Sequence, residues 1–198
     1  MVMKLFKWGG FAVLASFVVL VIVRMFVLDA QEKTAEQVAK IHATILTLDD
    51  VMGKNVPPDP GAEADKTVQG IDANENGIRD DVELAIFKEY PNSAKTRAVL
   101  LQYALALQME MIQPIVNMET VTAVAEKTSG GYYCIGEITS RKDMIKFIEI
   151  GNELHTFVES RQLNTQERKK TQEDFYSSNL GSYELSSDCD IDITALPN

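Results

Sequence analysis

The stretch that decides the fold lies at residues 99–112 and reads Val-Leu-Leu-Gln-Tyr-Ala-Leu-Ala-Leu-Gln-Met-Glu-Met-Ile. Its apolar residues point nearly all round a helix, as expected for a helix that other elements surround. Asn92 or Ser93 can cap this helix, and Pro114 should kink it or divide it before a further helix from Ile115 to Ala125. The sequence therefore predicts a mainly α fold built around one central helix.

Patterns on both sides of this stretch predict the elements that cover it. We expect a helix from Asp80 to about Tyr90, another from about Thr139 to Arg161, and a shorter one that starts at Asn164 with a capping box to Glu167. Ser129-Gly130-Gly131 predicts a turn. The tail from Ser182 to Leu196 should be short extended or irregular chain.

An apolar stretch near the N-terminus has the length of a membrane-spanning helix. From Gly9 to Leu28 only Ser16 and Arg24 are not apolar, and a helix of this length spans about 30 Å, the thickness of the hydrocarbon core of a bilayer. Lys4 and Lys7 precede the stretch, and the residues that follow it are acidic or mixed. The positive-inside rule predicts a cytoplasmic N-terminus and a domain on the outer side.

Apolar residues continue beyond Arg24, and Leu28 is too large for a good cleavage site. We therefore expect a retained single-pass anchor, with a cleaved signal segment as the alternative. The next segment carries an apolar stripe, which predicts a helix from about Glu32 to Met52. The expected organisation is a cytoplasmic N-terminus (1–8), an anchor (9–28), an amphipathic stalk helix (29–52), a linker loop (53–71) and a helical domain (72–198).

The charge balance disfavours one class of function. Residues 31–198 contain 28 acidic and 16 basic side chains. Phosphates and anionic lipid head groups repel such a surface, so we do not expect the protein to bind nucleic acid.

The two cysteines, Cys134 and Cys189, both follow the apolar segment. In an oxidising compartment an isolated pair usually forms a disulfide, which is our expectation. Two buried free thiols are the alternative. Two cysteines without suitably placed histidines do not suit zinc.

Residues 72–83 read Asp-Ala-Asn-Glu-Asn-Gly-Ile-Arg-Asp-Asp-Val-Glu and match the spacing of a twelve-residue calcium loop. Calcium takes six to eight oxygen ligands, and Gly77 permits the sharp turn that brings them together. The predicted ligands are the side chains of Asp72, Asn74, Asn76, Asp80 and Glu83 and the backbone carbonyl of Ile78. The alternative is a polar turn before a helix that Asp80 and Glu83 cap, which leaves the spacing of the earlier residues without a reason.

The loop resembles an EF-hand loop, with two departures. Arg79 occupies the place where EF-hands carry an aliphatic residue, and no amphipathic helix is expected before Asp72. The segment is thus more similar to the dockerin-type calcium motifs of extracellular bacterial proteins, a loop with an exit helix. Residues 70–83 with Tyr90-Pro91 also resemble small exported proteobacterial proteins of unknown function. These resemblances imply calcium and a bacterial inner-membrane protein with its domain in the periplasm.

No familiar catalytic pattern occurs in the sequence. His42 and His155 are the only histidines, and Glu149 with Glu153 is an ordinary pair of helix acids. Our first hypothesis is a non-enzymatic, membrane-tethered module that a structural calcium stabilises and that binds an unknown protein partner. The alternatives are an envelope hydrolase that uses acidic residues, and a periplasmic sensor or inhibitor.

Overall fold

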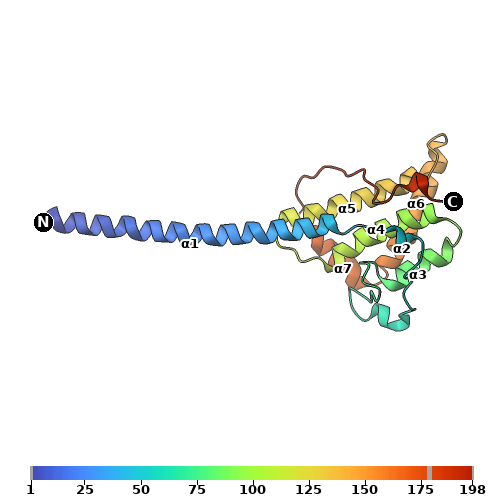
Figure 1. Ribbon diagram of the computed structural model, residues 1–198, viewed down its shortest axis with the longest axis horizontal. Coiled ribbons are helices and arrows are strands. Elements are labelled where there is room, and N and C mark those ends of the chain that lie inside the picture. Colours follow the sequence, from blue (N-terminus) through green and yellow to red (C-terminus); the bar gives the residue numbers. More distant parts are fainter. Residues whose placement is uncertain (1, 178–179, 198) are drawn as a thin grey trace.

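The computed structural model describes residues 2–177 and 180–197 of the chain. It is mainly helical, as predicted, and within these two ranges it contains no strand. One long helix extends from a helical domain (Figure 1). The helices are α1 (Val2–Ala43), α2 (Leu48–Val51), α3 (Asp80–Glu89), α4 (Ala94–Ile112), α5 (Met118–Glu137), α6 (Met144–Gln162) and α7 (Gln166–Ser177), with the 3-10 turns η1 (Gly61–Asp65) and η2 (Ile193–Ala195).

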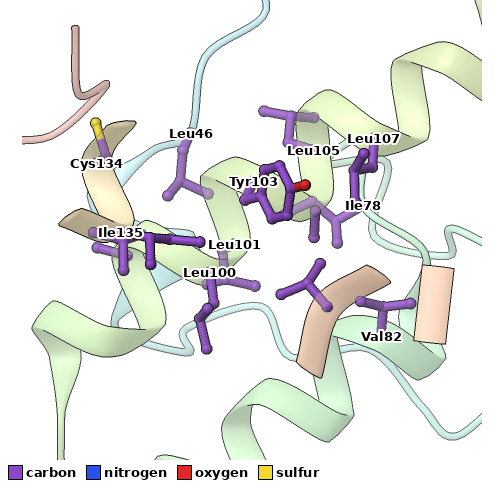
Figure 2. Close-up of a cluster of buried hydrophobic side chains, with 14 of the residues drawn as sticks. Leu46, Ile78, Val82, Leu100, Leu101, Tyr103, Leu105, Leu107, Cys134 and Ile135 are labelled. Atoms are coloured by element: carbon purple, nitrogen blue, oxygen red, sulfur yellow. The ribbon is translucent and has the colours of Figure 1, made fainter. Parts of the chain in front are cut away.

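Helix α4 is the centre of the domain. It packs against α2, α3, α5, α6, α7 and η2, and its residues are buried nearly all round. Figure 2 shows leucines of this helix among side chains from α3, α5 and the chain before α2. The hydroxyl of Ser93 accepts the backbone N–H of Thr96 and caps the helix, as predicted. Pro114 lies in the connector to α5, which begins at Met118 and not at Ile115.

The predicted stalk helix over 29–52 is wrong at its C-terminal end. Helix α1 runs without a break from Val2 to Ala43, and the helix stops before the end of the apolar stripe. A capping box starts the separate short helix α2 after this break. The Thr47 hydroxyl accepts the N–H of Asp50, and the Asp50 carboxylate accepts the N–H of Thr47. The stripe therefore buries Ile41 but leaves Leu48 52% exposed.

The turn predicted at Ser129-Gly130-Gly131 is also wrong, since α5 continues through these residues. The glycines serve close packing instead. A Cβ on Gly131 would lie 2.9 Å from the Cα of Tyr103, so α4 and α5 can approach this closely only without a side chain there. A Cβ on Gly130 would lie 3.2 Å from the carbonyl oxygen of Asp188 in the C-terminal segment. Glycine thus marks a helix contact here.

The predicted linker over 53–71 is part of the domain. It contains η1, and the guanidinium of Arg168 on α7 is fully buried against it. This group donates hydrogen bonds to the carbonyl oxygens of Ala64, Thr67 and Val68 and to the carboxylate of Asp65. The region that the sequence presents as a loop is therefore fastened to α7.

The capping box predicted for Asn164 and Glu167 is replaced by another arrangement. The Asn164 side chain binds Asp65 and Arg168, and the hydroxyl of Thr165 accepts the N–H of Arg168 at the start of α7. Asn164 therefore contributes to the attachment of the 53–71 segment rather than to the helix end.

Candidate metal site

The predicted calcium loop lies between the 53–71 segment and the first turn of α3. The residues from Lys66 to Arg79 are not helical, and α3 leaves the loop at Asp80. Gly77 has a φ of 84°, and Glu75 has a φ of 58°. Two residues in this left-handed region turn the chain sharply, and glycine adopts it without strain.

Side-chain oxygens of the loop accept backbone N–H groups of the same loop. The Asp72 carboxylate accepts the N–H of Asn76 at 3.1 Å and that of Gly77 at 2.8 Å. The Asn76 side-chain oxygen accepts the N–H of Ile78 at 2.8 Å. These bonds hold the side-chain oxygens of Asp72 and Asn76 on the inner side of the turn.

Glu83 is the buried end of this network. Its side chain is 1% exposed, and one carboxylate oxygen accepts the side-chain amides of Asn74 at 3.1 Å and of Asn76 at 2.9 Å. The structure therefore brings Asn74, Asn76 and Glu83 into direct contact, and Asp72 joins them through the backbone of Asn76.

Asp80 is fully buried and accepts the backbone N–H of Ala73 at 3.0 Å. Arg79 precedes α3, and among the described residues no side chain caps this helix. The alternative interpretation of Asp80 and Glu83 as a capping box is therefore wrong. The side chain of Ile78 is fully buried in the core beside α4 (Figure 2), and its N–H is held by Asn76.

The charges of the loop are poorly compensated. Burial raises the pKa of Glu83 to about 7, against the opposing effect of the hydrogen bonds from Asn76 and Asn74. Burial also raises the pKa of Asp80. The neighbouring Arg79 donates to both carboxylate oxygens of Asp81. Within residues 14–177 and 180–197 the ion pairs include none with Asp72, Asp80 or Glu83.

The donor set fits a hard cation that prefers oxygen. Asn74 and Asn76 present amide nitrogens to Glu83, and a half-turn of each amide would present its oxygen instead. Carboxylate and amide oxygens are the ligands that calcium prefers. The part of the chain that the structure describes contains no group of three or more His, Cys, Asp or Glu side chains close enough to hold a metal ion.

The predicted disulfide is confirmed. Cys134 on α5 and Cys189 in the C-terminal segment are joined, with their sulfur atoms 2.01 Å apart. Cys134 is fully buried. The bond fastens the irregular residues after 180 to the end of α5 that lies far from the apolar N-terminal segment of α1 (Figure 1).

One of the two histidines of the sequence lies in the interior of the domain. His155 is 7% exposed and stacks on the ring of Tyr132 at 3.6 Å between centroids, and Tyr103 contacts its edge. Its Nε2 lies 3.3 Å from the carbonyl oxygen of Tyr132, and no partner for Nδ1 occurs among the described residues. Burial lowers the pKa of His155, while the carbonyl of Tyr132 and the charge of Glu159 oppose this.

His155 also lines a cavity of about 720 Å³ between α5, α6 and the residues after 180. The walls are largely apolar and include the aromatic side chains of Tyr132, Tyr133 and Phe147. Behind one wall Glu110 is buried and accepts hydrogen bonds from Thr128, Gln172 and Tyr176. The apolar pattern of α4 gave no signal for this acid, because a single glutamate in an apolar helix has no distinctive spacing.

No protein-family model, curated protein or solved structure matches this chain.

Proposed function

We propose that the chain is a membrane-anchored extracytoplasmic module, which one structural calcium ion stabilises and which offers an acidic surface to a protein partner. The observation that carries the calcium proposal is the buried Glu83 carboxylate, which faces two amides and no cation among the described residues. A buried charge without a partner is costly, and a bound cation removes that cost.

The location is supported by the helix and by the disulfide. Helix α1 is long and apolar enough to cross a membrane, and its residues 14–33 are exposed on the part of the helix that extends from the domain (Figure 1). The disulfide between Cys134 and Cys189 is typical of oxidising compartments outside the cytoplasm. Lys4 and Lys7 favour an N-terminus in the cytoplasm and a domain in the periplasm.

The calcium ion would have a structural role. Asn74 donates to the carbonyl oxygen of Asn55 at 2.8 Å and also to Glu83, so the loop lies between the 53–71 segment and α3. A cation held by the loop would fasten this segment to the domain from one side, while Arg168 holds it from the other. The acidic character of the chain, with a net charge of −10, favours a partner with a basic contact surface.

The test is a thermal melt of the purified full-length chain in detergent, with 10 mM calcium chloride or with chelator. For a dissociation constant of about 0.1–1 mM, typical of extracellular calcium modules, this concentration should stabilise the fold by about 1.4–2.7 kcal/mol. For a chain of this size the melting temperature should rise by about 3–11 °C. Magnesium should have a smaller effect, because it dehydrates reluctantly and requires octahedral geometry.

Two matched variants locate the ion. Glu83→Gln should abolish the calcium shift while it leaves the melt in chelator unchanged or higher, since a buried charge is removed. Glu75→Gln changes an exposed acid of the same loop at a position without a predicted ligand role, and it should retain the shift. An equal shift in all three proteins would place the ion elsewhere. Identical melts with calcium and with chelator would refute the calcium site.

Retention of the anchor has its own measurement. Intact-mass spectrometry of the protein purified from membranes should give the mass of the uncleaved chain, and alkaline extraction should leave the protein in the membrane pellet. A soluble periplasmic product that starts near Ala30 would support the cleaved alternative.

A further inference from the structure

The connector between α4 and α5 exposes apolar side chains in an otherwise strongly acidic protein. No charged residue occurs between Glu110 and Glu119. The apolar side chains and their exposed fractions are Ile112 (43%), Ile115 (46%), Val116 (44%) and Met118 (56%). A group of exposed apolar side chains on a charged protein commonly marks a contact surface.

This connector lies at the end of the domain from which the anchor segment of α1 extends. The Asn117 side chain donates to the Thr34 hydroxyl at 2.9 Å, and further along both helices His42 Nε2 lies 3.9 Å from a carboxylate oxygen of Glu126. Helices α1 and α5 therefore run side by side in the same direction. The start of α5, and the connector before it, face the N-terminal part of α1 (Figure 1).

The helical rise fixes the distance from this connector to the apolar segment. Thr34 follows Leu28, the last residue of the apolar run, by six positions on the unbroken helix α1, which corresponds to about 9 Å along the axis. The head-group layer on each side of the hydrocarbon core is about 5–8 Å thick. Side chains that project from the connector can bridge the small remaining distance.

We propose that residues 112–118 form a second membrane contact, in which their apolar side chains enter the head-group region of the bilayer that α1 spans. This inference rests on the proposed membrane anchor. The bilayer surface is the occupant that the geometry favours, because the anchor helix itself brings the connector to it. Since the connector carries no charge, insertion costs no ion desolvation and should not require anionic lipid.

The test places single tryptophans in the full-length chain and measures their quenching by two lipids, one brominated near the head group and one brominated near the ends of the acyl chains. Trp8, the only native tryptophan, is first replaced by phenylalanine. Val116→Trp then reports on the connector, and Phe17→Trp reports on the anchor. Ile145→Trp is the control, because it is 72% exposed on α6, whose first turn follows the distal end of α5. All are reconstituted in nanodiscs of uncharged phosphatidylcholine.

The proposal predicts that Val116→Trp loses most of its emission with the lipid brominated near the head group, that Phe17→Trp does so with the lipid brominated near the chain ends, and that Ile145→Trp keeps its emission with both. Quenching at Phe17→Trp without quenching at Val116→Trp would overturn the second contact and leave the anchor in place. A blue-shifted but unquenched Val116→Trp would assign the connector to a second copy and overturn the proposal as well. Equal quenching at Val116→Trp and Ile145→Trp would mean that the whole domain lies along the membrane, and it would overturn a contact made by the connector. Absence of quenching at Phe17→Trp would overturn the proposed anchor and this inference together.

Discussion

Replacement of Arg168 by methionine should strongly destabilise the protein, although Arg168 is not one of the predicted site residues. The guanidinium is fully buried and fastens the 53–71 segment to α7. Methionine fills a similar volume but donates no hydrogen bond. The lost partners are the carbonyl oxygens of Ala64, Thr67 and Val68 and the side chains of Asp65 and Asn164.

The magnitude follows from these contacts. A hydrogen bond from a charged group contributes about 1.5–3 kcal/mol, but the bonds are not additive, and water can reach part of the exposed segment around η1 once it loosens. Truncation of one partner in a buried, charged network typically costs about 3–5 kcal/mol. At about 2–4 °C per kcal/mol for a chain of this size, the melting temperature should fall by about 6–20 °C.

Thermal melts and urea titrations at constant calcium measure the loss, and hydrogen exchange of residues 61–70 measures where it occurs. Lys169→Met is the matched control, because Lys169 is the exposed neighbour on the same helix, and its effect should stay within about 0.5 kcal/mol. A similar loss in both variants would assign the effect to α7 itself. An Arg168→Met protein as stable as wild type would refute the reasoning that this side chain holds the segment.

Three further predictions concern the domain. Gly131→Ala should lower the free energy of unfolding by about 1–3 kcal/mol, because its Cβ would lie 2.9 Å from a backbone atom of α4. Gly151→Ala, whose Cβ would have nothing within 4 Å, should raise the free energy of unfolding by about 0.5–1 kcal/mol, and urea unfolding measures both changes. Because the folded pKa of His155 lies below its usual 6.5, the unfolded chain takes up the proton first, and the free energy of unfolding should fall as the pH drops below this value. His155→Gln should remove this fall in the free energy of unfolding, and His42→Gln, at an exposed site, should not, as measured by urea unfolding between pH 5 and 7.5. Reduction of the disulfide, which joins residues separated by 55 positions, should cost about 4 kcal/mol in the same assay with and without dithiothreitol.

The helices of the domain were largely predictable because their signals are local. The apolar run of 99–112, the Ser93 cap and the block at Pro114 each act within a few residues, and α4 begins and ends close to the predicted places. The pairing of Cys134 with Cys189 was predicted from their number and from the expected oxidising compartment.

The errors arose where distant parts of the chain decide the local structure. Gly130 and Gly131 have the composition of a turn, yet close approach of α4 and of the C-terminal segment selects glycine within a helix. The segment 53–71 has the composition of a linker, but a buried arginine from a helix about 100 residues later holds it. Neither contact leaves a trace in the nearby sequence.

The candidate site was predictable in its spacing and not in its electrostatics. The positions of Asp72, Asn74, Asn76 and Glu83 identified the loop, and the structure brings these residues into one network. The burial of Glu83 depends on packing against the rest of the domain, so no sequence pattern could indicate that its charge is enclosed.

The unbroken course of α1 joins the apolar N-terminal segment to the domain through one continuous helix. Over Val2–Ala43 it is about 63 Å long, and each residue turns the helix by about 100°. One alanine inserted between Asp29 and Thr34 would therefore lift the domain by only about 1.5 Å but rotate it by nearly a third of a turn relative to the anchor. Four inserted residues would raise the domain by about 6 Å and leave it only about 40° from its original heading. The length of this one segment therefore sets the heading and the height of the domain together, and the heading is by far the more sensitive of the two.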